Sequence, residues 1–115
     1  MVRAKPNHLM NKATNNKYGL SERDKKTIRD ILRKYPKVKT VYLFGSRAKG
    51  NNNPGSDVDL AIMNKGLDLK TVSRIKSEFE ESSLPFRVDI INYPELTNKD
   101  LKDHIDRVGI PFLYQ

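Results

Sequence analysis

Three aspartates have the side-chain type and the spacing of a metal-binding cluster. Asp57 and Asp59 stand two residues apart in the stretch SDVDLAI, and Asp89 stands in the otherwise apolar stretch FRVDII. Side chains two residues apart on a strand point the same way, so Asp57 and Asp59 repel each other unless a cation lies between them. An Asp-x-Asp pair alone is more often structural. With Asp89 on a neighbouring strand, however, three carboxylates can hold two hard divalent ions, Mg²⁺ or Mn²⁺.

A glycine-serine pair precedes these aspartates and has the character of an anion site. Gly45 allows a phosphate to approach the backbone, and Ser46 supplies an amide and a hydroxyl at the expected start of a short helix. Arg47 and Lys49 add positive charge, and each is open to two interpretations, phosphate contact or solvated surface charge. The loop that follows is rich in Asn, Pro and Gly, with Asn51–Asn53 as turn formers, and returns the chain to the aspartates.

Hydrophobic periodicity indicates the elements that must position these residues. Residues 21–36 predict a helix that has Ser21 as its N-cap and is ended by Pro36. Further helices are predicted over 67–83 and 98–109, strands over 38–44, 57–63 and 85–93, and an edge strand over 110–114. This order predicts an α+β fold, a small mixed β-sheet with helices mostly on one face.

Composition limits the class of protein. The 115 residues suit one domain and carry a net charge of +8, half of it on residues 1–20, which contain no acidic residue. We therefore expect a flexible basic N-terminal arm over 1–20 and a single folded domain over 21–115. The chain contains no cysteine, which excludes disulfides and thiolate zinc sites. It has no apolar run of a membrane span or secretory signal, so we expect a cytoplasmic protein without a membrane partner.

The motifs taken together resemble a known family. Gly45-Ser46, ten residues, then Asp57-x-Asp59 and a later Asp89 are similar to the signature of the DNA polymerase β-like nucleotidyltransferases. The fuller stretches FGSRAKG, SDVDLAI and LPFRVDIINY resemble the minimal nucleotidyltransferase (MNT) branch, and the likeness covers residues 22 to about 108. The resemblance implies a polymerase β-like palm fold in which Gly45 and Ser46 hold the nucleotide phosphates. It also implies that Asp57, Asp59 and Asp89 bind two Mg²⁺ ions and act in catalysis.

The resemblance further implies the reaction and the partner. Minimal members resemble the antitoxin of two-gene modules whose partner is a helical HEPN protein, and the family transfers a nucleotide, usually AMP from ATP, to a hydroxyl. Two alternatives remain open: a non-catalytic nucleotide-binding module that neutralises a helical toxin by contact, and a transferase acting on a small aminoglycoside-like acceptor. Direct nucleic-acid binding is not expected, because no surface combining aromatic and basic residues is evident. The acceptor, the base preference and the homo- or hetero-oligomeric state do not follow from the sequence.

Overall fold

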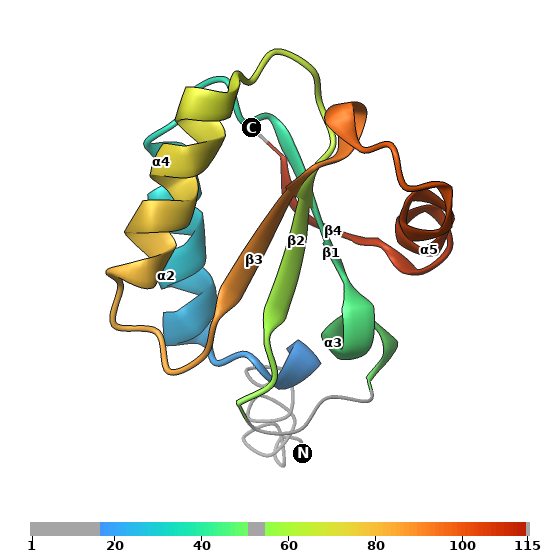
Figure 1. Cartoon of the computed structure of the whole chain (residues 1–115). Helices are drawn as coiled ribbons and strands as arrows, with labels where there is room; N and C mark the ends of the chain where they lie inside the picture. The colour runs from blue at the N-terminus through green and yellow to red at the C-terminus, as the bar shows by residue number, and fades with distance from the viewer. Residues whose placement is uncertain (1–16, 51–54, 115) are drawn as a thin grey trace, which may run out of the picture.

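The computed structural model describes residues 17–50 and 55–114, and its centre is a four-stranded sheet in the order β3-β2-β1-β4. The strands are β1 (Thr40–Phe44), β2 (Val58–Ile62), β3 (Val88–Asn92) and β4 (Ile110–Tyr114). β1 pairs antiparallel with β2 and β4, whereas β2 and β3 run parallel (Figure 1). The predicted mixed sheet is therefore confirmed, and so is the edge position of the last strand, where Pro111 is tolerated.

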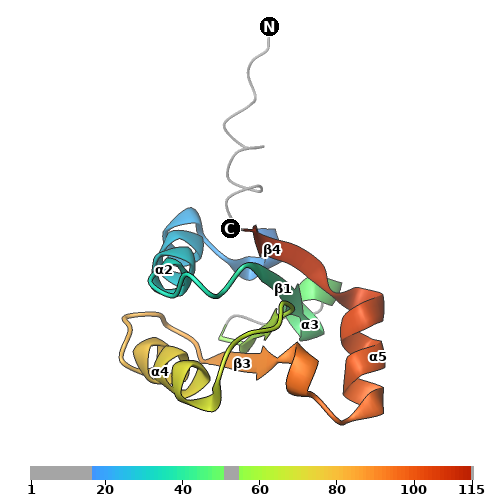
Figure 2. The same cartoon turned by 90° about the horizontal axis from the view of Figure 1, so that it is seen from above.

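Helices pack on both faces of this sheet, and the two longest share one face. α2 (Glu22–Arg33) and α4 (Leu69–Glu80) lie side by side on it, and α5 (Lys99–Val108) packs on the opposite face (Figures 1 and 2). The short α3 (Gly45–Lys49) follows β1 without a linker, and η1 (Lys17–Gly19) and η2 (Tyr93–Glu95) are 3₁₀ turns. The predicted α+β class is confirmed, and the two longest helices share one face while α5 covers the other.

Side-chain caps begin the three longer helices. The N–H of Asp24 donates to Oγ of Ser21 at 3.0 Å, as the sequence predicts for an N-cap, and Asp68 and Asn98 cap α4 and α5 in the same way. α2 ends at Arg33, three residues before Pro36, because the N–H of Lys34 already turns back to the carbonyl of Ile31 at 3.2 Å. The caps thus determine where each helix starts, and α2 ends in a turn just before Pro36, as the sequence predicts for a helix followed by a proline.

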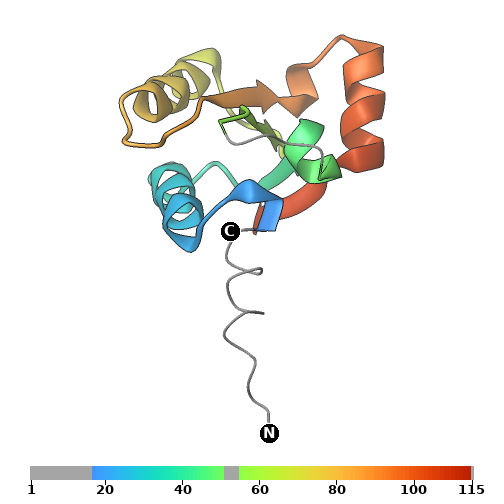
Figure 3. The same cartoon turned by 90° about the horizontal axis from the view of Figure 1, so that it is seen from below.

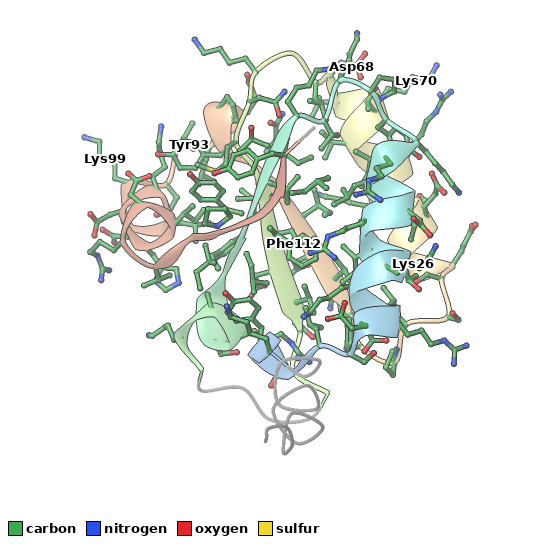
Figure 4. All side chains as sticks on the ribbon, turned by 180° about the vertical axis from the view of Figure 1, so that it is seen from behind. Lys26, Asp68, Lys70, Tyr93, Lys99 and Phe112 are labelled. Atoms are coloured by element: carbon green, nitrogen blue, oxygen red, sulfur yellow. The ribbon has the colours of Figure 1, made fainter. Side chains whose placement is uncertain are left out.

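Two apolar clusters hold the layers together. The larger lies between the sheet and the α2–α4 layer, and the smaller joins the other face to α5 through Phe44, Ala61 and Ile105. Phe112 of β4 points toward α2, where the guanidinium carbon of Arg29 lies 5.0 Å from its ring centre (Figure 4). Fully buried members of the larger cluster are Leu20, Ile28, Leu32, Val38, Val41, Leu43, Val58, Leu60, Ile62 and Ile75.

The folded part begins earlier than the predicted boundary at residue 21. η1 and Leu20 fall within the expected flexible arm over 1–20, yet Leu20 is fully buried in the larger cluster and Tyr18 packs against it. The sequence pattern missed this because one buried leucine beside a turn has no periodicity. Residues 1–16 and the turn formers Asn51–Asn53 lie outside the described residues. None of the helices within 17–50 and 55–114 has the length and apolar character needed to cross a lipid bilayer.

Substitution of Leu20 tests this boundary. Leu20→Ala removes a fully buried side chain and should lower the free energy of unfolding by about 2–4 kcal/mol, measured by urea denaturation. Leu69→Ala is the matched control, because Leu69 is 84% exposed and should change stability by less than about 0.5 kcal/mol. Equal stability of the two variants would contradict the inclusion of Leu20 in the core.

Candidate active site

The parallel pairing of β2 with β3 brings two of the predicted aspartates together. Asp59 stands directly opposite Asp89 in the register, so both side chains lie on the face that carries α5. Asp57 precedes the first residue of β2 by one position and is exposed. Figure 3 views the molecule from the end of the sheet at which β1 meets α3 and β2 begins. The structure therefore gathers at one end of the sheet what the sequence separates by thirty residues.

The glycine of the glycine-serine pair lies against the carboxylate of Asp59. Phe44 is the cross-strand partner of Asp59, so Gly45 follows at the point where β1 becomes α3. Gly45 has a φ of +78°, and a Cβ built on it would overlap Oδ2 of Asp59. Glycine is thus required both by the backbone conformation and by the space that Asp59 occupies. The sequence had suggested only phosphate approach as the reason for this glycine.

The first turn of α3 presents main-chain donors beside this carboxylate. Its N-cap, Phe44, makes no side-chain capping bond, and Ser46 is half-buried in the first turn. Lys49 ends the helix and is exposed, which is compatible with either interpretation that the sequence left open. The predicted phosphate-binding residues Gly45 and Ser46 therefore stand next to the aspartates.

Burial, together with repulsion by neighbouring carboxylates, raises the pKa of Asp59 to about 6. Burial of the carboxyl is the largest cause, the negative charges of Asp89 and Asp57 add to it, and the positive charge of Arg47 opposes it. A carboxylate held against two others has an excess of negative charge that a cation would neutralise.

The donor set fits a hard divalent ion, since it consists of carboxylate oxygens whose negative charges repel one another. Within residues 17–50 and 55–114, however, no three His, Asp or Glu side chains are already gathered as a complete metal-binding group. The three-aspartate metal cluster therefore stays a prediction.

Arg87 is a residue that the sequence reasoning missed. Its Nη2 lies 3.7 Å from Oδ1 of Asp89, and the two side chains are 73% and 49% exposed. Residues two apart along a strand share a face, so the spacing of Arg87 and Asp89 was a usable signal. The arginine partly balances the charge of Asp89.

Arg47 is buried, so it is not the solvated surface charge that the sequence left open as one interpretation. It is 1% exposed, and its guanidinium donates to the carbonyls of Tyr18, Gly19 and Ser56 at 2.7–3.1 Å. The ring centre of Phe86 lies 4.8 Å from its guanidinium carbon. Arg47 thus joins η1, α3 and the residues that precede β2 and β3.

Burial destabilises the positive charge of Arg47, and nearby carboxylates offset part of this effect. Burial lowers the pKa of the guanidinium, whereas the carboxylates of Asp24, Asp57 and Asp59 oppose the shift. Because its donors are engaged by main-chain carbonyls, we assign Arg47 to holding the site together. The predicted phosphate contact of Arg47 remains untested.

Substitution of Arg47 separates a structural role from phosphate binding. Arg47→Met removes the buried donor to the carbonyls of Tyr18, Gly19 and Ser56 and should lower the free energy of unfolding by about 2–4 kcal/mol, measured by urea denaturation. Lys49→Met, at an exposed position of the same helix, should change it by less than about 0.5 kcal/mol. Unchanged stability of Arg47→Met with weaker nucleotide binding would favour the phosphate role instead.

Because the pKa of Asp59 is raised, replacing this carboxylate by a neutral side chain should stabilise the protein at neutral pH but not at acidic pH. Between pH 4 and about 6 the folded state binds more protons than the unfolded state, so stability falls as the pH rises through this window. Asp59→Asn removes that loss and should raise the melting temperature by a few degrees at pH 7.5 in EDTA, but not at pH 4.

Asp103→Asn on the exposed side of α5 is the matched control and should show no such pH dependence. Thermal unfolding followed by circular dichroism measures both variants. A variant Asp59→Asn that is less stable than the parent at pH 7.5 would contradict the repulsion.

Known proteins are similar to this chain in sequence and in fold. Residues 26–114 match the family model described as "Polymerase beta, Nucleotidyltransferase". A protein of Haemophilus influenzae named "Probable protein adenylyltransferase MntA" is 39% identical over 84 residues, which cover 72% of this chain and 73% of that protein.

Two solved structures share the fold at lower identity. One chain of a toxin-antitoxin structure with AMP-PNP superposes on this chain with a TM-score of 0.65 at 23% identity, and the match covers 80% of this chain and 74% of the matched chain. A complex of the tri-AMPylated Shewanella oneidensis HEPN toxin with its MNT antitoxin gives a TM-score of 0.59 at 22% identity, over 79% and 70%. The family model spans most of the chain, and the chain therefore belongs to the polymerase β nucleotidyltransferase family and is a nucleotidyltransferase.

Proposed function

We propose that this protein is a metal-dependent adenylyltransferase that transfers AMP from ATP to a hydroxyl of a helical HEPN-type partner protein, in the manner of an antitoxin. The observation that carries the proposal is the register of β2 and β3, which sets Asp59 opposite Asp89 beside the start of α3. The Haemophilus influenzae relative is named a protein adenylyltransferase, and a protein of the same fold was solved bound to an AMPylated HEPN toxin. These names support AMP as the transferred group and a protein as its acceptor.

Two groups of residues bind different phosphates of ATP. Main-chain N–H groups at Gly45 and Ser46, with the hydroxyl of Ser46, hold the β- and γ-phosphates. Asp57, Asp59 and Asp89 surround the α-phosphate and the attacking hydroxyl. The acceptor oxygen attacks the α-phosphorus, the bond to the bridging oxygen breaks, and pyrophosphate leaves. Asp89 takes up the proton that the acceptor hydroxyl loses.

Two Mg²⁺ ions, or Mn²⁺, are the cofactors that these carboxylates would hold. Bound there, they would neutralise the charge that develops on the attacking and leaving oxygens. The chain itself supplies the positions of the carboxylates, which the β2–β3 register sets and which Gly45 makes room for. Alignment of the reactants and electrostatic stabilisation then account for most of the acceleration.

Substitution of the carboxylates tests the proposal. With purified HEPN-type partner, Mg²⁺ and α-labelled ATP, the parent protein should add labelled AMP to the partner, detected also by intact mass. Asp57→Asn and Asp89→Asn should each reduce the rate by about 100-fold or more while keeping the fold, checked by thermal unfolding. Asp103→Asn should transfer as the parent does, because it lies on the exposed side of α5.

The same variants distinguish catalysis from neutralisation by contact. Transfer by Asp57→Asn and Asp89→Asn at the rate of the parent would overturn the assignment of these residues. Neutralisation of a toxic partner by Asp57→Asn, Asp59→Asn and Asp89→Asn alike would favour the non-catalytic module instead. Omission of Mg²⁺ and addition of EDTA should abolish transfer by the parent protein.

A further inference from the structure

The edge of the sheet beside the carboxylates has an open side along β3. β3 is the outer strand of the sheet, so one of its sides has no strand neighbour in the part of the chain that the structure describes. The N–H of Val58 donates to the carbonyl of Arg87 at 2.8 Å, so the main chain of Arg87 and of every second residue after it faces β2. The N–H and C=O groups of Val88, Ile90 and Asn92 consequently point away from the sheet. We call this row of main-chain groups the β3 edge.

Two hollows border the β3 edge along its length. The larger, of about 910 Å³, is lined by Asp57, Asp89 and the loop between α4 and β3. The smaller, of about 480 Å³, lies at the other end of the strand, between the start of α4 and η2. Both are lined by Lys76 and Ile90, so the hollows adjoin, and Leu69, 84% exposed, stands in the smaller one. Figure 2 shows β3 at the outer side of the sheet, between α4 and α5.

An edge of this kind is suited to pairing with another strand. Natural proteins protect edge strands with lysines, prolines or bulges, and β4 at the opposite edge contains Pro111 and an irregular register. β3 has the sequence VDIIN and a regular register with β2, without lysine, proline or bulge, and its one charged residue is Asp89 of the candidate site. In addition, the buried Oδ1 of Asn92 has no hydrogen-bond partner among the described residues. A strand added at this edge could supply a hydrogen-bond donor to Oδ1 of Asn92.

We infer that the β3 edge is the docking site for an extended segment of the acceptor protein, which adds to the sheet as a fifth strand. This inference rests on the proposed function, because it presupposes a protein acceptor. The continuity of the edge with the site determines the occupant, since Asp89 belongs to the same strand and lines the larger hollow. A segment paired here cannot avoid passing the carboxylates.

The geometry of pairing also places the acceptor hydroxyl. Directly opposed residues of adjacent strands project their side chains on the same face, with Cβ atoms about 4.5–5.5 Å apart. The main chain of Asp89 faces β2, so an antiparallel segment would meet it in a non-hydrogen-bonded pair, in which side chains approach most closely. A Ser, Thr or Tyr at that position of the added strand therefore sets its hydroxyl beside Asp89 and Asp59. Main-chain hydrogen bonds to the β3 edge would supply affinity, and the register of the added strand would determine which of its hydroxyl residues lies opposite Asp89.

Amide hydrogen exchange of the ¹⁵N-labelled full chain, alone and with the purified HEPN-type partner, tests the inference. The outward amides of Ile90 and Asn92 should exchange rapidly in the protein alone and slow by about tenfold or more in the complex. The amides of Asp89 and Ile91 face β2 and serve as internal controls, because they should be protected in both samples. The amides of β4, at the opposite edge, should keep their rates.

A matched pair of variants adds a functional measurement. Val88→Pro removes an outward N–H at the first position of β3 without removing a bond to β2, whereas Val88→Ala shortens the side chain and keeps the N–H. Val88→Pro should weaken partner binding and slow transfer by about tenfold relative to Val88→Ala, with equal binding of ATP. Equal partner binding and transfer by the two variants would overturn the inference.

The outcomes separate this inference from the proposed function. Transfer of AMP to a bound partner without protection of Ile90 and Asn92 overturns the docking site and leaves the proposed function standing. Protection of these amides without transfer overturns the proposed function and leaves the docking surface. Protection that rises with the concentration of the protein alone identifies a second copy as the occupant and overturns the assignment to an acceptor.

Discussion

The register between β2 and β3 forces like charges together, and much of the local structure follows from that constraint. Asp59 opposite Asp89, with Asp57 just before β2, is an unfavourable arrangement, because burial and then the charges of Asp89 and Asp57 raise the pKa of Asp59. A protein selected for stability alone would place apolar or oppositely charged pairs at these positions. In the proposed function, divalent cations would balance the charge of these carboxylates.

Neighbouring residues make the arrangement tolerable without removing it. Gly45 gives Asp59 the space that any side chain would take, and Arg87 lies within ion-pair distance of Asp89. Arg47 contributes from within the structure, where its buried positive charge opposes the protonation of Asp59 while its donors tie together η1 and the approach to β2. One arginine thus serves packing and electrostatics at once, which is possible because a guanidinium carries several donors in a fixed plane.

Much of this could be predicted from the sequence, and the failures have physical causes. Period-two and helical patterns located every strand and the three longer helices, and an aspartate inside an apolar strand indicated its pairing with the Asp-x-Asp strand. The pattern could not locate Leu20 or the burial of Arg47, because both depend on contacts between segments far apart in the chain. Equally, Ala61 is buried against α5 although it alternates with aspartates, since packing of a helix on the second face leaves no periodic signal in one short strand.

The direction of β2 and β3 has a consequence for how the protein is made. Parallel strands cannot be joined by a tight turn, so the chain must complete residues 63–87, including α4, before Asp89 can reach Asp59. Closing such a loop costs entropy that is recovered only when both strands and the helix pack together. A chain in which α4 and β3 have not yet folded, such as one still emerging from the ribosome, cannot hold Asp89 opposite Asp59. The active site therefore cannot assemble until the chain has been made through β3, well beyond the strand that carries Asp59.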